Sequence, residues 1–280
     1  MQRSRLIDAA GIETFAYCEG TGPPIVMLHG WASTADMWQP VLNKLGTDYQ
    51  VIAPDLPGHG RTAGGRQPFG IAFFRRWLAG LFDALKLPQA TLIGNSMGGA
   101  ISLAYTQAHQ ERVTRLVLVD ALGLSEAIPW STVPRIMRRM PHLVAAAITR
   151  QADPHLLRWV DSLIVADPWG QPRETILETI RLNSRQGIWP LWSGLRLLLA
   201  DFLLPSQRRD FTRRLADIRV PTLIVWGRHD GLLPVAHAFA GAQTIPDSQV
   251  VVLERSSHEP MLEEPAEFVR AVRAFLNGAG

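Results

Sequence analysis

One serine in the chain stands in a setting that is typical of a catalytic nucleophile. Positions 94–98 read GNSMG, directly after the apolar run at 90–93 and directly before a helix-like stretch. A serine on so tight a turn takes a strained backbone conformation, and glycine at the flanking positions avoids clashes with the neighbouring backbone. The turn lifts the hydroxyl clear of the sheet, so we expect Ser96 to act as a nucleophile.

A serine hydroxyl is nearly inert at neutral pH and needs a base, and His258 is the histidine best placed for that role. It lies in the loop SSHEP at 256–260, which follows the last apolar run of the sequence. A loop of this kind lies at the same edge of a parallel sheet as Ser96, and the order serine, acid, histidine accompanies such a serine turn. The sequence therefore predicts His258 as the general base.

Two aspartates compete for the role of the acid that orients His258. Asp230 follows the apolar run at 222–226 in the turn GRHD, whereas Asp120 ends the run at 115–119. Both lie at the carboxyl ends of expected strands, where functional residues of such sheets collect. The turn favours Asp230, which would hold the imidazole in one tautomer and stabilise the imidazolium. Asp120 would then serve the structure or line the pocket.

The motif HGW at 29–31 follows a further apolar run and completes the expected chemistry. Its glycine allows a tight turn, after which the backbone N–H of Trp31, together with that of Met97, can form an oxyanion hole. His29 precedes the turn, which indicates a structural role in hydrogen bonding the loop. We interpret the turn-rich segment PDLPGHG at 54–60 as scaffold.

Short apolar runs alternate with helix-length stretches along most of the chain. Continuous apolar character is what a sheet covered on both faces requires. We therefore expect an α/β fold with a doubly wound, mostly parallel sheet, and an antiparallel edge strand at 13–18. The runs interpreted as buried strands are 24–28, 50–54, 90–94, 115–120, 221–226 and 249–253. The stretches interpreted as helices are 69–87, 97–110, 234–242 and 265–276.

The region 123–205 breaks this alternation. It holds no strand-like run, prolines punctuate its helical patterns, and five of the nine tryptophans lie in it. We interpret 123–205 as a helical cap inserted into one core made of 1–122 and 206–280. Its tryptophans either contact an apolar group of the substrate or pack the cap against the core, since aromatic side chains serve both purposes.

Composition excludes several classes of function. The net charge is only +3, and the basic stretches lack interleaved aromatic residues, so we expect no nucleic-acid binding. The apolar stretch at 191–204 is interrupted by charges and too short to span a bilayer, and the N-terminus lacks the apolar run of a signal peptide. We expect a soluble, cytoplasmic protein. Cys18 is the one cysteine, so no internal disulfide forms, and no residue spacing indicates a metal or another cofactor.

These motifs together resemble the α/β-hydrolase superfamily, in its serine-nucleophile branch. The resemblance rests on positions 29–31, 54–60, 94–98, 227–230, 258–260 and 264–265. It implies the triad Ser96, Asp230 and His258 and a helical cap over the pocket. Haloalkane dehalogenases and epoxide hydrolases are similar but carry aspartate in place of the serine.

Two branches with the same triad resemble this chain in different motifs. The elbow at 94–99 is similar to that of meta-cleavage-product hydrolases, which break carbon–carbon bonds. Those enzymes usually have a glycine-rich run after His-Gly and a tryptophan after the catalytic histidine, whereas this chain has WAS at 31–33 and EP at 259–260. The His-Gly-Trp turn with Trp38 instead resembles carboxylesterases, including those that act on carrier-protein methyl esters.

We therefore expect hydrolysis of a small-molecule carboxylic ester through an acyl-enzyme on Ser96. A carbon–carbon bond hydrolase of the meta-cleavage-product type is the first alternative. A non-catalytic ligand-binding accessory protein on the same fold is the second, and the intact triad argues against it. Under the carboxylesterase resemblance, arginines of the cap could contact an acidic acyl carrier protein.

Overall fold

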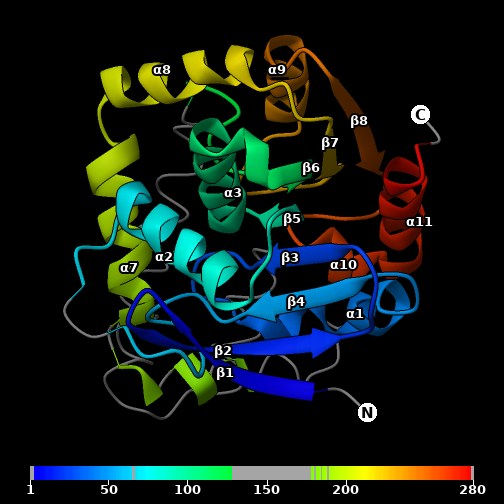
Figure 1. Cartoon of the computed structure of the whole chain (residues 1–280). Helices are drawn as coiled ribbons and strands as arrows, with labels where there is room; N and C mark the ends of the chain where they lie inside the picture. Colours follow the sequence, from blue (N-terminus) through cyan, green and yellow to red (C-terminus); the bar gives the residue numbers. More distant parts are fainter. Residues whose placement is uncertain are drawn as a thin grey trace.

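The computed structural model describes residues 3–64, 67–127, 178–179, 181–183, 185–187 and 189–278. An eight-stranded sheet runs through the molecule, and helices cover both of its faces (Figure 1). This arrangement confirms the predicted α/β class with a doubly wound, mostly parallel sheet. The strands are β1 Arg3–Ala9, β2 Ile12–Glu19, β3 Pro24–Leu28, β4 Gln50–Pro54, β5 Ala90–Asn95, β6 Val113–Val119, β7 Thr222–Gly227 and β8 Ser248–Leu253.

The strands lie in the order β1-β2-β4-β3-β5-β6-β7-β8. Strands β3 to β8 pair in parallel with one another, whereas β2 pairs antiparallel with both β4 and β1. All six apolar runs expected as parallel strands are therefore strands of the sheet. Their continuous apolar character follows from burial on both faces.

The strand predicted at 13–18 is antiparallel, as expected, but the prediction that it forms the edge of the sheet is wrong. Strand β1 pairs along the outer side of β2 and is itself the edge. Its sequence, RSRLIDA, contains three charged residues and no apolar run. Leu6 is 63 % exposed while the next residue, Ile7, is buried. A strand solvated on one face alternates in this way, so a search for continuous apolar runs passes over it.

The helices of the described residues lie on the two faces of the sheet and beyond its carboxyl edge (Figure 1). They are η1 Ala35–Trp38, α1 Gln39–Leu45, α2 Ile71–Ala84, α3 Met97–Ala108, η2 Gln110–Arg112, α7 Trp189–Leu197, η3 Leu198–Phe202, α8 Pro205–Arg213, η4 Arg214–Asp217, α9 Ala236–Thr244, α10 Pro260–Glu263 and α11 Pro265–Leu276.

Alternate side chains of each strand enter two separate hydrophobic cores. In β3, Val26 and Leu28 lie in the core beneath α2 and α3, whereas Ile25 and Met27 lie in the core beneath α1 and α11. Because both faces of the sheet are buried in this way, polar side chains can gather only where the strands end. The fold therefore confines reactive groups to one edge of the sheet.

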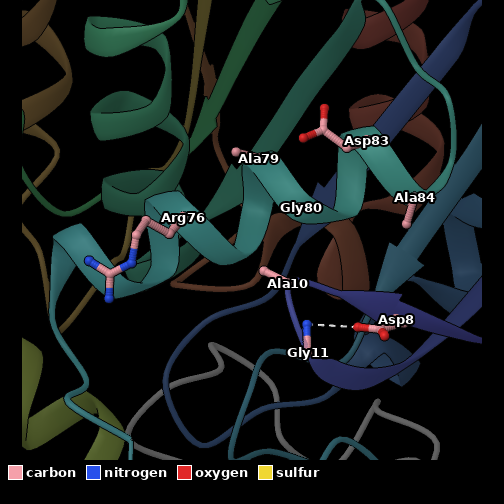
Figure 2. Close-up of a pocket in the computed structure, with 8 residues that line it drawn as sticks. All are labelled: Asp8, Ala10, Gly11, Arg76, Ala79, Gly80, Asp83 and Ala84. Atoms are coloured by element: carbon pink, nitrogen blue, oxygen red, sulfur yellow. Dashed lines mark hydrogen bonds between the residues drawn. The ribbon is translucent and has the colours of Figure 1, made fainter.

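Helix α2 packs closely on the hairpin of β1 and β2. A methyl group at Gly80 would lie 2.6 Å from the backbone nitrogen of Ala10, so glycine permits this approach. A surface hollow between helix and hairpin is lined by small residues with Arg76, Asp8 and Asp83 at its rim (Figure 2). It lies along the helix rather than at the carboxyl ends of the strands, so we do not consider it a candidate reaction site.

The predicted cap is described only in part. Within 123–205 the structure describes residues 123–127, three short stretches between 178 and 187, and the helical run from Trp189 that contains α7 and η3. Residues 128–177 lie outside the described part, so the division into a core of 1–122 and 206–280 and a cap of 123–205 stays a prediction. No helix among the described residues is long and apolar enough to cross a membrane.

The segment 54–60, interpreted from the sequence as scaffold, is held by one buried carboxylate. Asp55 accepts hydrogen bonds from the backbone N–H of Ala35 at 2.7 Å and of Arg61 at 2.8 Å. The guanidinium of Arg61 lies 3.2 Å from Asp55 and 2.9 Å from Asp36. Asp55 thereby ties the loop after β4 to η1 after β3.

Removal of the Asp55 carboxylate should destabilise the fold. Asp55→Ala leaves two backbone donors without their acceptor and breaks a largely buried ion pair, so we expect a loss of about 3–5 kcal/mol in the free energy of unfolding. Asp55→Asn keeps an acceptor oxygen for one donor and should lose less. Urea denaturation followed by circular dichroism measures both. An alanine variant within about 0.5 kcal/mol of wild type would contradict the scaffold role.

Candidate active site

The loops that carry the predicted site residues leave five neighbouring strands at one edge of the sheet. Strands β3, β5, β6, β7 and β8 are consecutive in the sheet and run parallel. The loops that follow them carry Trp31, Ser96, Asp120, Asp230 and His258, in that order. The topology therefore brings together residues that are up to 227 positions apart in the sequence.

Ser96 occupies a strained turn between β5 and α3. Its φ of +52° and ψ of −113° are rare for a residue with a side chain and cluster at functional sites. A methyl group at Gly94 would overlap the carbonyl oxygen of Gly98, and one at Gly98 would overlap the carbonyl oxygen of Leu28. Both glycines are thus required for the close packing that holds the serine at the start of α3.

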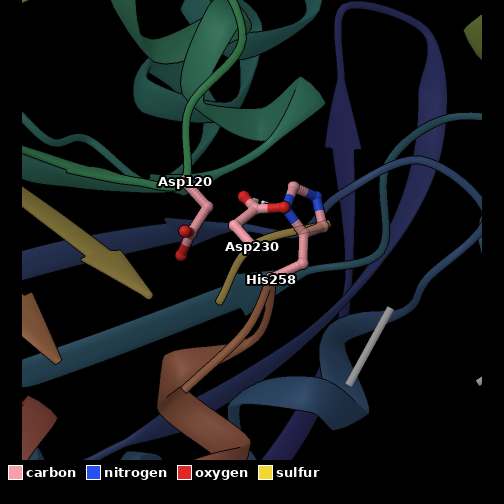
Figure 3. A group of neighbouring side chains, drawn as sticks. All are labelled: Asp120, Asp230 and His258. Atoms are coloured by element: carbon pink, nitrogen blue, oxygen red, sulfur yellow. Dashed lines mark hydrogen bonds and ion pairs between the residues drawn. The ribbon is translucent and has the colours of Figure 1, made fainter. Parts of the chain in front are cut away.

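His258 is oriented by Asp230 (Figure 3). The Nδ1 of His258 lies 2.7 Å from Oδ2 of Asp230, and their side chains are 6 % and 0 % exposed. The other carboxylate oxygen, Oδ1, accepts the backbone N–H groups of Leu232 and Leu233 at 2.7 and 2.9 Å. This pairing places a proton on Nδ1, so Nε2 of the neutral ring is the free base. Of the two candidate acids, Asp230 is therefore the one that contacts the imidazole.

Two glutamates hold the loop that carries the histidine. Glu263 accepts hydrogen bonds from the backbone N–H of Ser257 at 3.0 Å and of Glu259 at 3.1 Å. Glu264 accepts the hydroxyl of Ser256 at 2.7 Å and the backbone N–H of Arg255 at 3.0 Å. Burial opposes ionisation of Glu264, but these hydrogen bonds outweigh it and lower the pKa of the carboxyl. Glu263, at the end of α10, thus holds the amides on both sides of the histidine, and Glu264, the N-cap of α11, holds the loop before it.

Asn95 is a site residue that the sequence analysis did not single out. Its side-chain amide, which is buried, donates to the backbone carbonyls of His258 at 3.1 Å and of Val119 at 3.3 Å. It therefore connects the serine turn directly to the histidine loop. The residue before the serine is a free position in the G-x-S-x-G pattern, so only its polar character at the end of an apolar strand could have indicated this role.

Asp120, the rejected candidate acid, lies beside Asp230 and is fully buried (Figure 3). Its Oδ1 accepts the backbone N–H of Gly227 at 2.9 Å, whereas Oδ2 has no hydrogen-bond donor within the described residues. Burial, and then the charge of Asp230, raises the pKa of Asp120 well above its ordinary value. The neutral, protonated form of Asp120 is therefore favoured, and Asp230 is the carboxylate that pairs with the imidazole.

The turn at 29–33, which we call the β3 turn, packs against the serine. A methyl group at Gly30 would lie 3.3 Å from Cβ of Ser96 and closer still to the side chain of Asn95. No hydrogen bond among the described residues uses the backbone N–H of Trp31 or of Met97. Met97 is the first residue of α3, where N–H groups face outward along the helix axis. Both amides are therefore available to a ligand atom beside Ser96.

His29 and His59 are buried and neutral. Nε2 of His29 accepts the backbone N–H of Leu56 at 2.9 Å, so its Nδ1 carries the proton and donates to the carbonyl of Gly30 at 2.8 Å. Burial lowers the pKa of His29 to about 4 and holds the pKa of His59 well below its ordinary value. His29 thus ties the β3 turn to the loop after β4, in line with the structural role expected for it.

Among the described residues, the side chains of Asp120, Asp230 and His258 lie close enough to be tested as a metal site. One possible ligand atom from each lies within 4.8 Å of the others. Nδ1 of the histidine is already paired with Asp230, and one oxygen of each aspartate accepts backbone N–H groups. These contacts fit a network that shares protons better than a metal site, since a cation would have to displace the Nδ1 proton.

The contacts between His258 and Asp230 predict how the pKa of His258 changes when Asp230 is replaced. Burial lowers the pKa of His258, but the charge and the hydrogen bond of Asp230 outweigh burial and raise it above 6.5. Asp230→Asn removes the charge and leaves the burial, so the pKa of His258 should fall below 6.5. The imidazole resonances in NMR spectra measure this midpoint, with His258→Gln for assignment.

Asp120→Asn is the matched control for that titration. The amide keeps an acceptor for the N–H of Gly227, and it is neutral like the protonated acid. We therefore expect the pKa of His258 to change little. If the midpoint falls as far as in Asp230→Asn, Asp120 is ionised in the native protein and the assignment of the proton is wrong.

Comparisons with known proteins agree with this architecture. The chain is 31 % identical to the 2-hydroxy-6-oxo-2,4-heptadienoate hydrolase of Pseudomonas putida, over 97 % of this chain and 95 % of that protein. It is 29 % identical to the monoacylglycerol lipase ABHD6 of Rattus norvegicus, over 92 % and 76 % of the two chains. The solved structure of a protein from Acinetobacter baumannii, named a putative lipase, superposes with a TM-score of 0.86 at 23 % identity, covering 99 % of this chain and 91 % of that one.

The match to a family model covers most of the predicted core and the whole of the predicted cap. Residues 23–265 match the model of the family described as alpha/beta hydrolase fold. That span contains the β3 turn, the serine turn, both buried aspartates and the histidine loop. The chain therefore belongs to the α/β-hydrolase family, and it is a hydrolase.

Proposed function

We propose that this hydrolase cleaves carboxylic esters through an acyl-enzyme on Ser96. The observation that carries the proposal is the buried pair of His258 and Asp230, whose loop is joined by Asn95 to the strained serine turn. A neutral imidazole with a fixed Nδ1 proton has its Nε2 free to accept the proton of a hydroxyl nucleophile. These are the parts that nucleophilic acyl transfer requires.

The proposed reaction has two balanced steps. The oxygen of Ser96 attacks the ester carbonyl while Nε2 of His258 takes the hydroxyl proton, and the backbone N–H groups of Trp31 and Met97 stabilise the oxyanion. The carbon–oxygen bond of the ester then breaks, and the leaving alcohol receives the proton from the imidazolium. Water, activated by the same imidazole, attacks the acyl-enzyme and releases the acid and the free serine.

Asp230 stabilises the imidazolium formed in each step, and Asp120 beside it is kept neutral by burial. A neutral Asp120 adds no second negative charge beside Asp230, so the pair carries a single charge that the imidazolium can balance. We further propose that 123–205 roofs the pocket as a cap, because its described part contacts the β3 turn. The tryptophan ring at position 31 donates to the carbonyl of Pro190 at 2.8 Å.

A carbon–carbon bond hydrolase is the second candidate, and the Pseudomonas putida relative supports it. The name of that relative specifies a dienoate, which carries a carboxylate that a cation would bind. Arg61, on the loop beside the β3 turn, is already paired with Asp36 and Asp55. The lipase relative from rat supports ester hydrolysis instead. Cap arginines at 135, 138 and 139, which could bind a carboxylate or an acyl carrier protein, lie outside the described residues.

Hydrolysis of p-nitrophenyl esters from acetate to laurate tests the proposal. Wild type should hydrolyse part of the series, and Ser96→Ala should lower kcat by about 10⁴–10⁶-fold with little change in Tm. A vinylogous dienoate ketone, assayed with the same two proteins, tests the second candidate. Faster turnover of the ketone than of every ester would assign the enzyme to carbon–carbon hydrolysis, and equal activity of wild type and Ser96→Ala would refute both.

The pH dependence of ester hydrolysis follows from the protonation of His258. The base must be neutral, and its pKa is raised above 6.5 by Asp230 against the effect of burial, so kcat/KM should rise with pH with a midpoint above 6.5. Asp230→Asn should move this midpoint to lower pH and reduce the plateau by about 10⁴-fold. A midpoint unchanged by Asp230→Asn would show that another group controls the limb.

A further inference from the structure

The β3 turn contains a second strained residue, Ala32. Its φ of +59° lies in the left-handed region, which costs a residue with a side chain roughly 1–2 kcal/mol. The backbone carbonyl of Ala32 accepts a hydrogen bond of 2.7 Å from the side chain of Asn183, which lies 151 positions away in the predicted cap. The side chain of Asn183 thus forms a hydrogen bond with the β3 turn at its strained residue, Ala32.

Both ends of the Asn183 amide are used. Nδ2 donates to the carbonyl of Ala32, and Oδ1 accepts the backbone N–H of Gly60 at 2.8 Å. A carbonyl can only accept and an N–H can only donate, so these two partners fix the orientation of the amide. Asn183 therefore bridges the β3 turn to the loop after β4.

The neighbouring residue of the turn is also held by the cap segment. The indole of Trp31 donates to the carbonyl of Pro190 at 2.8 Å, and a methyl group at Gly194 would overlap the indole ring. The side chain of Trp31 and the carbonyl of Ala32 are thus anchored on the segment 183–194. The backbone N–H of Trp31 is left with no hydrogen bond among the described residues.

We propose that Asn183 is a positioning residue that sets the direction of the Trp31 N–H by holding the carbonyl of Ala32. The inference rests on the proposed function, in which that N–H stabilises the oxyanion. The carbonyl of Ala32 and the N–H of Ser33 belong to one peptide unit, and that N–H donates to the carbonyl of Gly30 at 3.3 Å. The carbonyl of Gly30 shares its peptide unit with the N–H of Trp31, so a rotation of the peptide that Asn183 holds alters the direction of this N–H. A donor displaced by about 1 Å loses much of its catalytic effect. The role predicts a loss in the chemical step rather than in substrate binding.

Gln186 supplies the matched control. It lies in the same segment and donates from Nε2 to the carbonyl of Gly60 at 2.9 Å. It therefore fastens the cap segment to the same loop as Asn183 does, and none of its hydrogen bonds among the described residues reaches the β3 turn. A general loosening of the cap should appear in variants of both residues, whereas a positioning effect should appear only in variants of Asn183.

The experiment compares wild type with Asn183→Ala, Asn183→Asp, Gln186→Ala and Ser96→Ala. Asn183→Asp keeps the acceptor for Gly60 and loses the donor to the carbonyls of Ala32 at 2.7 Å and Ser33 at 3.4 Å, so it removes the side-chain contacts with the β3 turn alone. Two rates are measured: hydrolysis of the best p-nitrophenyl ester, and phosphonylation by a fluorophosphonate probe. In the second, the oxygen of Ser96 forms a bond to phosphorus, fluoride leaves, and His258 takes the proton. Tm is recorded for each variant.

We expect both Asn183 variants to lose about 10–100-fold in kcat and in the rate of phosphonylation, with KM changed less than threefold. Gln186→Ala should retain both rates. Equal losses in Gln186→Ala and Asn183→Asp, or losses confined to KM, would overturn the positioning role. So would full activity of Asn183→Asp. If wild type reacts with the probe no faster than Ser96→Ala does, the proposed function itself fails and the role of Asn183 fails with it.

Discussion

The carboxylate of Asp230 is a charge with no exposed surface, and the carboxyl edge of the sheet is arranged around it. A buried carboxylate without partners would take up a proton, because burial disfavours the charged form. Here Leu232, Leu233 and His258 each donate a hydrogen bond to it, and the neighbouring Asp120 is favoured in its neutral form. The charge raises the pKa of the imidazole, and the loops after β6, β7 and β8 must keep their positions for the charge to persist. Stability of the edge and basicity of the histidine therefore have the same physical origin.

The sequence sufficed to predict those features whose signal is local. The six parallel strands are continuous apolar runs, and the serine turn requires glycine at 94 and 98 within five consecutive positions. Asn95, Asp120 and Asn183 have no comparable signal, because each acts through a partner at least 24 positions away that only the folded sheet brings near. The edge strand β1 was missed for a different reason, since half of its side chains face water.

The serine turn and the β3 turn each contain a residue with a strained backbone, and different contacts hold the two residues in place. Ser96 keeps its strained conformation through close packing of backbone on backbone, which two glycines permit. Ala32 accepts its hydrogen bond from Asn183, which lies in the predicted cap. A conformation maintained by a few polar contacts is more easily altered than one maintained by dense packing. The serine turn is therefore fixed by the core, whereas the β3 turn also depends on contacts from the predicted cap.

This difference between the two turns is consistent with relatives that are similar over most of the chain but whose names specify different substrates. Ester cleavage and carbon–carbon cleavage beside a serine turn both place negative charge on a carbonyl oxygen, and both require a base that returns its proton to a leaving group. The serine turn and the buried pair of His258 and Asp230 can therefore remain unchanged between the two reactions. Asn183 and Pro190 contact the β3 turn from outside the core, through the carbonyl of Ala32 and the indole of Trp31. Substitutions near these two residues can therefore change the geometry of the β3 turn while the buried aspartates and the histidine keep their contacts.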